Sequence, residues 1–142
     1  MSDLLIWSHA YSVGHEVVDG QHKKLVGLIN TLHNIGDGPN AATEVEAVLD
    51  ELIRYTVYHF GTEERLFAEH GYPRAADHAA IHKHLIGDVS AQVKLLQGGD
   101  RAMREKLLVF LVDWLKDHIL GEDTLFRKFL ASQGVVAEED DL

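Results

Sequence analysis

The chain has 142 residues, of which 46% are hydrophobic and 25% are charged, a composition typical of one globular domain. Its net charge of -10, without a cluster of lysine and arginine, argues against nucleic acid and anionic membranes as partners, because both attract basic surfaces. The absence of cysteine excludes disulfides, thiolate zinc sites and iron–sulfur clusters. We therefore expect a single domain over residues 1–142.

The sequence contains no recognisable signal peptide or membrane-spanning run. Residues 1–7 have no positively charged region and too short an apolar run for a signal peptide. The longest apolar run, residues 107–112, is far too short to cross a bilayer. A cytoplasmic protein without membrane insertion is therefore expected. Because the chain has only two prolines and its glycines lie between segments of helical periodicity, an all-α fold is favoured.

Residues 1–18 show no clear period and are expected to form an N-terminal arm over the core. Asp19 is then a candidate N-cap for a first helix, in which Val26 and Ile29 share a stripe with His22. The Gly- and Pro-containing residues 36–40 end this helix. The apolar residues assigned to the arm are Trp7, Tyr11, Val13, Val17 and Val18.

A second helix is predicted from the capping-box pattern of Thr43 and Glu46 to about residue 69, where Gly71 follows. His59 and Glu63 lie in the middle of its apolar stripe, four residues apart and thus on one face. An imidazole and a carboxylate are therefore expected to face the core.

A third helix is predicted over about residues 74–96, and it carries His78 and His82 on its apolar face. Asp100 is a candidate cap for a fourth helix, in which the apolar stripe aligns with His118. Gly121 is expected to loosen this helix before the apolar pattern resumes at residues 125–130. The acidic tail, residues 132–142, is expected to be solvated and disordered.

Four amphipathic helices with short connections predict an all-α, up-down-up-down antiparallel four-helix bundle with an N-terminal arm. Six ionisable side chains lie on the stripes that should face its interior. One core histidine is usually structural and has a backbone partner, but six such residues on four helices indicate a metal site. These six residues are His22, His59, Glu63, His78, His82 and His118.

The remaining histidines are not expected to be ligands. His33 lies roughly 16 Å along the helix from His22, and His84 is off the face of His78 and His82. His9, His15 and His70 lie in the arm or at a helix end. Spacing alone selects Glu122 as the partner of His118, because Asp123 lies about 140° around an ideal helix from that histidine.

At these residues the chain resembles the hemerythrin family, specifically single-domain bacteriohemerythrins, from Trp7 to about Phe129. The resemblance includes residues 17–23, the His59-Phe60 pair with Glu63-Glu64, Gly71-Tyr72-Pro73, residues 78–82, and Trp114-Leu115 with His118-Ile119 and Asp123. It implies Asp123 rather than Glu122 as a ligand, which requires a π-like distortion of the helix near Gly121. The ligand set implied by the resemblance is His22, His59, Glu63, His78, His82, His118 and Asp123.

The resemblance implies two non-haem irons, bridged by the two carboxylates and by an oxo or hydroxo group. His78, His82 and His118 would bind one iron, and His22 and His59 the other. Two six-coordinate irons offer about twelve positions, of which the ligands and the bridge fill about eleven. The vacancy lies on the two-histidine iron, and dioxygen is expected to bind there.

The lining of this position is expected to be apolar, which favours reversible dioxygen binding for storage, delivery or scavenging over catalysis. The alternatives are a di-iron redox enzyme (a peroxidase, an oxidase or a nitric-oxide-handling protein) and an O₂ sensor module. We expect a monomer that is not an enzyme and that serves an O₂-consuming partner protein. The candidate pocket residues are Leu115, Ile119, Trp114, Phe60 and Leu25.

Overall fold

The computed structural model describes residues 4–12, 15–96 and 101–133. All regular elements in these ranges are helical, which confirms the all-α prediction. The elements are η1 (His9–Tyr11), α1 (Glu16–His33), α2 (Ala41–His70), α3 (Ala75–Leu96), α4 (Arg101–Asp117), the π-helix η2 (His118–Asp123) and α5 (Thr124–Ser132).

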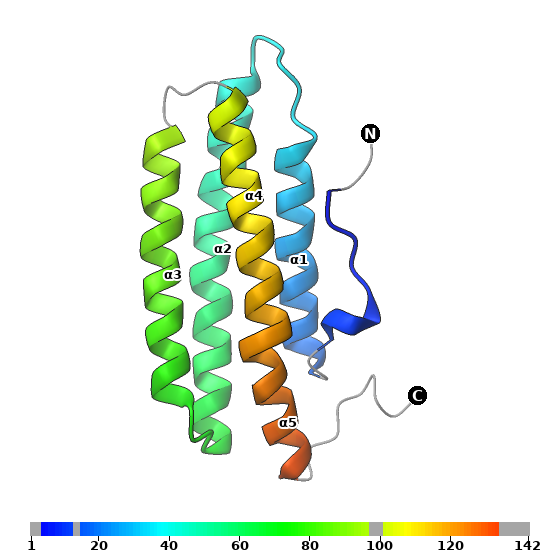
Figure 1. Cartoon of the computed structure of the whole chain (residues 1–142), viewed down its shortest axis with the longest axis vertical. Helices are drawn as coiled ribbons and strands as arrows, with labels where there is room; N and C mark the ends of the chain where they lie inside the picture. The colour runs from blue at the N-terminus through cyan, green and yellow to red at the C-terminus, as the bar shows by residue number, and fades with distance from the viewer. Residues whose placement is uncertain (1–3, 13–14, 97–100, 134–142) are drawn as a thin grey trace.

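The four long helices run alternately up and down, as predicted (Figure 1). Helices consecutive in the chain pack against each other, and α4 packs back against α1, so that the four close around a common interior. The segments η2 and α5 continue α4 as one rod towards the lower end of the bundle in Figure 1. Among the described helices, none has the length and apolar character needed to cross a bilayer.

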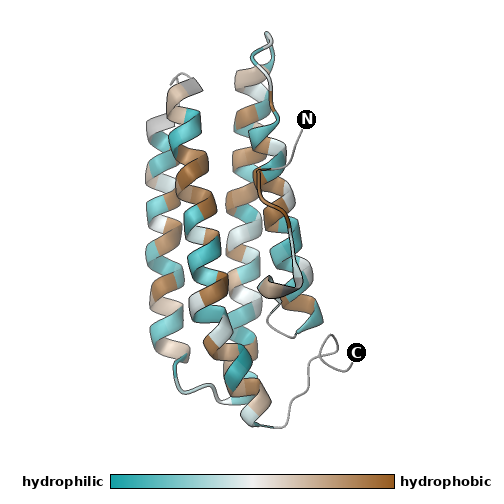
Figure 2. Cartoon of the chain, turned by 45° about the vertical axis from the view of Figure 1, so that its right-hand side comes forward, coloured by the Kyte–Doolittle hydropathy of each residue, from teal (hydrophilic) through white to brown (hydrophobic). Residues whose placement is uncertain are grey.

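Apolar and polar residues alternate along the helices, as amphipathic sequences require (Figure 2). The interior contains a large apolar cluster that includes Leu25, Phe60 and Leu111, and a smaller one around Phe67 and Phe126. Along α1, His22 lies between Val18 of the smaller cluster and Leu25 of the larger one. His22 therefore lies between the two apolar clusters of the interior.

The start of α1 differs from the prediction. The helix begins at Glu16, and the ring nitrogen Nδ1 of His15 accepts a hydrogen bond from the amide of Val18 at 3.5 Å. Asp19 was expected to be the cap but lies inside the helix, where its Oδ2 accepts a 2.6 Å hydrogen bond from Ser12 Oγ. Its carboxylate is buried and ties the arm to α1. Preference rules for caps favour aspartate and overlook an imidazole acceptor.

The predicted capping box at Thr43 is also wrong, because α2 begins at Ala41. Its start is set by a turn in which the amide of Ala41 donates to the carbonyl of Gly38 at 3.1 Å. The end of α2 is as predicted: Gly71 has φ 63°, the left-handed conformation that glycine adopts without strain. Asp100 lies outside the described residues.

The arm is held by one buried amide on α1. Asn30 Oδ1 accepts hydrogen bonds from the amides of Leu4 and Leu5, both at 2.9 Å, and Asn30 Nδ2 donates to the carbonyl of Leu5 at 2.7 Å. The arm is shorter than the expected 1–18, since Val17 belongs to α1 and is 51% exposed. Val13 lies outside the described residues.

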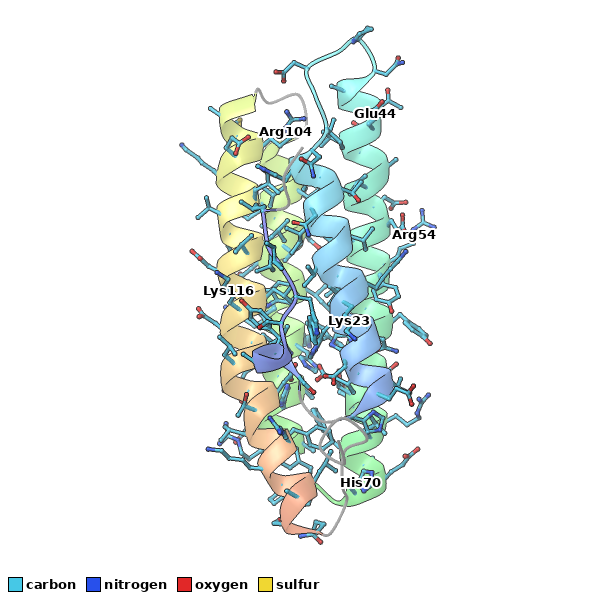
Figure 3. The ribbon with its side chains drawn as sticks, turned by 90° about the vertical axis from the view of Figure 1, so that its right-hand side faces the viewer. Lys23, Glu44, Arg54, His70, Arg104 and Lys116 are labelled. Atoms are coloured by element: carbon cyan, nitrogen blue, oxygen red, sulfur yellow. The ribbon has the colours of Figure 1, made fainter. Side chains whose placement is uncertain are left out.

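Both ends of the bundle show features that the sequence did not reveal. Near the α1–α2 connection, the buried Arg104 of α4 pairs with Asp37 at 3.3 Å (Figure 3). At the other end, α5 continues to Ser132, so the expected tail begins too early in the chain. Residues 134–142 lie outside the described residues.

Candidate metal centre

All four sides of the bundle contribute ionisable side chains to one interior site. His22 comes from α1, while α2 and α3 each supply two residues four positions apart, and the last two come from η2. Each of these side chains is at most 3% exposed. The seven residues are His22, His59, Glu63, His78, His82, His118 and Asp123.

These donor atoms form two adjoining groups. One contains Glu63 with the three histidines His78, His82 and His118, and the other contains Glu63 and Asp123 with His22 and His59. Within each group the ligand atoms lie within 4.8 Å of one another. Glu63 belongs to both groups, and Asp123 Oδ1 also lies 3.2 Å from Nε2 of both His78 and His118. Each carboxylate thus reaches both halves of the site.

The contacts in this site are short, yet several lack the angles of hydrogen bonds. His22 Nε2 lies 2.9 Å from Asp123 Oδ2, and His78 Nε2 lies 3.2 Å from Asp123 Oδ1, but all four atoms lack a hydrogen-bond partner. The same is true of Nε2 of His59 and His82 near Glu63. Buried polar atoms without partners are costly, and lone pairs that converge without pairing are what a metal ion requires. This nitrogen and oxygen donor set suits first-row transition metals.

The electrostatics of the site follow from burial and from two carboxylates among imidazoles. Burial disfavours the anionic form of Glu63, but His59, His118 and His82 hold its pKa well below the usual range. Burial lowers the pKa of His59. For His118 burial acts in the same direction, but the carboxylates of Asp123 and Glu63 overcome it and raise the pKa to about 9. The metal-free site therefore retains a proton that a metal would displace.

The comparisons with known proteins agree with this geometry. A family model described as the hemerythrin HHE cation binding domain matches residues 13–130. The chain belongs to the hemerythrin family. It is 36% identical to a bacteriohemerythrin of Pseudomonas paraeruginosa over 84% of this chain and 76% of that protein. It is 32% identical to a bacteriohemerythrin of Methylococcus capsulatus over 91% of this chain and 98% of that protein.

Solved hemerythrin structures also share the fold. A wild-type hemerythrin crystal structure superposes with a TM-score of 0.77 at 32% identity, covering 88% of this chain and 96% of that one. A hemerythrin mutant with leucine replaced by tyrosine gives 0.78 at 31% identity, covering 89% and 97%. Membership of the hemerythrin family implies O₂ binding and non-haem iron, and the two donor groups are compatible with iron ligation.

Glu122, which directly follows Gly121, points away from the site. Glu122 pairs with Arg74 at 3.2 Å, whereas Asp123 is fully buried and faces His118 at 3.2 Å. The ideal-helix choice of Glu122 is therefore wrong. The reason is η2, a π-helical turn over His118–Asp123 that brings residues five apart onto one face.

The other described histidines lie outside both donor groups. His84 is 79% exposed and lies 3.3 Å from Asp88, and His15 caps α1. His33 and His70 are half-buried last residues of α1 and α2, and Figure 3 shows His70 at the end of the bundle. The side chain of His9 lies outside the described residues.

The five expected pocket residues are buried, and two of them contact the histidines directly. The ring of Phe60 is stacked on His82 with 3.8 Å between centroids and 2° between planes. Trp114 is stacked on His118 at 6.1 Å. The remaining three, Leu25, Leu115 and Ile119, belong to the same apolar cluster as these two rings.

Two polar neighbours of the site were not assigned any role from the sequence. Gln21 Oε1 lies 2.7 Å from His59 Nδ1, and Glu64 Oε2 lies 3.1 Å from His82 Nδ1. Each is adjacent in sequence to a member of the donor groups, His22 or Glu63. That adjacency was the available signal, but it could not say which imidazole each residue would reach across the bundle.

Proposed function

We propose that the seven side chains hold two non-haem irons, bridged by Glu63, Asp123 and an oxo or hydroxo group, and that this pair binds O₂ reversibly. His78, His82 and His118 belong to one iron, and His22 and His59 to the other. The observation that carries the proposal is the sharing of Glu63 between two groups of buried donors, most of which have no hydrogen-bond partner. A single metal would leave one of these groups without a partner.

The iron pair, when bound, supplies the electrons for O₂ binding. The protein orients five imidazoles and shields them from water. Phe60 and Trp114 cover His82 and His118, and Leu25, Leu115 and Ile119 complete an apolar wall. None of these five lining residues carries an acidic group that could protonate O₂ for O–O bond cleavage, which favours a carrier for storage, delivery or scavenging over an enzyme.

The test is an iron count combined with visible spectra of the reduced protein before and after O₂ is added. We expect two irons per chain and a charge-transfer spectrum that disappears under vacuum. One iron per chain, or no spectral change with O₂, would overturn the proposal.

A di-iron redox enzyme, such as a peroxidase, an oxidase or a nitric-oxide-handling protein, is the competing function. Stopped-flow mixing of the reduced protein with O₂ separates the two. A carrier forms a stable adduct, whereas rapid multi-turnover consumption of O₂ with a reductant would establish the enzyme.

A further inference from the structure

The five imidazoles of the site differ at the nitrogen that faces away from it. The Nδ1 atoms of His59 and His82 have polar side-chain partners, Gln21 and Glu64. The Nδ1 atoms of His22, His78 and His118 are buried and have no hydrogen-bond partner among the described residues. In each donor group, one histidine thus has a hydrogen-bond partner for its Nδ1 atom, and this partner is a side chain from outside the donor groups.

The orientation of the Gln21 amide is fixed by a second contact. Gln21 Nε2 donates to Thr62 Oγ1 at 3.1 Å, while the Thr62 hydroxyl donates to the carbonyl of Tyr58 at 3.2 Å. With its proton committed to Tyr58, Thr62 acts as the acceptor for Gln21. The amide oxygen of Gln21 must then face His59 and accept a hydrogen bond from Nδ1–H.

This contact determines which nitrogen of His59 can bind a metal. A hydrogen on Nδ1 leaves the lone pair on Nε2, which is the atom that lies 3.2 Å from Glu63 Oε1. Gln21 and Thr62 are 6% and 4% exposed, so water does not easily replace either partner. The link therefore runs from Thr62 on α2 to Gln21 on α1 and back to His59 on α2.

The two partners differ in charge. Gln21 is a neutral, buried amide, whereas Glu64 is a carboxylate that is 44% exposed. A carboxylate behind an imidazole draws its proton more strongly and makes the opposite nitrogen a stronger donor than an amide does. The exposure of Glu64 weakens this effect by solvent screening but does not remove it.

We propose that Gln21, oriented by Thr62, is a positioning residue for His59, and that its neutral amide makes the two-histidine half of the site a weaker metal site than the half served by Glu64. This inference rests on the proposed dimetal site. It concerns the affinity of each half for metal, so it can fail while the proposed function stands.

The test is calorimetric titration of the metal-free protein with Co²⁺, an ion suited to this donor set. Wild type should show two binding events of unequal affinity. Gln21→Leu should weaken one event by about 10–100-fold and leave the other within about threefold. Gln21→Glu, which restores an acceptor and adds charge, should bind at least as tightly as wild type. Glu64→Gln should weaken the other event.

Thr62→Val should weaken the same event as Gln21→Leu, because the amide can then rotate. The matched control is Thr31→Val on α1, whose hydroxyl likewise donates to the carbonyl four residues earlier, at 2.9 Å, but lies on the exposed surface. The melting temperature of each metal-free variant reports any loss of packing.

Selective loss in Gln21→Leu with rescue in Gln21→Glu supports the positioning role. Equal weakening of both events, or a lower melting temperature in Gln21→Leu without rescue by Gln21→Glu, shows a packing role and overturns it. Unchanged binding in Gln21→Leu also overturns it, while leaving the dimetal site intact. A wild-type protein that takes up no Co²⁺ overturns both proposals.

Discussion

Metal-free protein is expected to lose stability as the pH rises from about 6.5 to about 9, because His118 then gives up a proton that the fold holds. Burial of this ring opposes its charge, but Asp123 Oδ1 at 3.2 Å and Glu63 Oε1 at 3.3 Å favour it. The balance raises the pKa of His118 from 6.5 to about 9. The folded state therefore binds this proton more tightly than the unfolded chain does.

The sign and the size of this change in stability follow from the interval between the two pKa values of His118, 6.5 in the unfolded chain and about 9 in the folded protein. The contribution of His118 is complete below pH 6.5, its unfolded pKa, and is lost as the pH passes about 9. The interval corresponds to about 3–4 kcal/mol at most, at about 1.4 kcal/mol per pH unit. His59 acts in the opposite direction: burial lowers its pKa, so its contribution is lost as the pH falls below 6.5. Metal-free stability should therefore be highest near pH 6.5.

The assay is urea unfolding of chelator-treated protein, followed by circular dichroism at several pH values between about 6 and 9.5. Metal-loaded protein should not show the decline, because the metal occupies the nitrogen that otherwise binds the proton. His118→Asn should flatten the metal-free profile, whereas the exposed control His84→Asn should leave it unchanged. A metal-free wild type whose stability is constant or increases from pH 6.5 to 9 would refute the reasoning.

Three further changes test other parts of the site. His78→Ala removes a nitrogen from the three-histidine group and opens a cavity, so we expect loss of iron and about 2–5 kcal/mol of stability; two irons per chain with a normal melting temperature would contradict its role. Leu115→Asn buries an unpaired amide, which should cost about 1–3 kcal/mol and speed oxidation of the O₂ adduct, measured by its visible absorption. Gly121→Ala should keep the full metal content, because the added Cβ meets nothing within 4 Å; loss of metal would show that the π-turn needs glycine.

Most of the fold could be predicted because it depends on periodicity. The apolar stripes of the four helices fixed which faces are inward, and the same stripes brought His22, His59 and His78 to the interior. What periodicity could not supply are contacts between residues distant in the chain. Asn30 binding the arm, Arg104 pairing with Asp37, and Gln21 reaching His59 each depend on how one helix is rotated against another.

The cap of α1 shows a second kind of limit. Asp19 has the residue type that caps helices, but the structure uses it as a buried acceptor for Ser12 and leaves capping to His15. Residue preferences describe isolated helix ends, whereas here the arm competes for the same carboxylate. A rule based on residue type alone cannot decide between two local partners that are both available.

The π-turn η2 explains why residue spacing alone selected Glu122 in place of Asp123. An α-helix continued through residue 123 would turn Asp123 away from His118 and present Glu122 instead. The wider turn brings Asp123 to the site and leaves Glu122 for Arg74. It also sets the rotation of α5, whose buried Phe126 packs at 4.7 Å against Phe67 of α2. Phe67 in turn lies 4.6 Å from the ring of His78, so the apolar contacts of α5 reach the three-histidine group. These contacts can stabilise the π register that places Asp123, and the metal need not impose it.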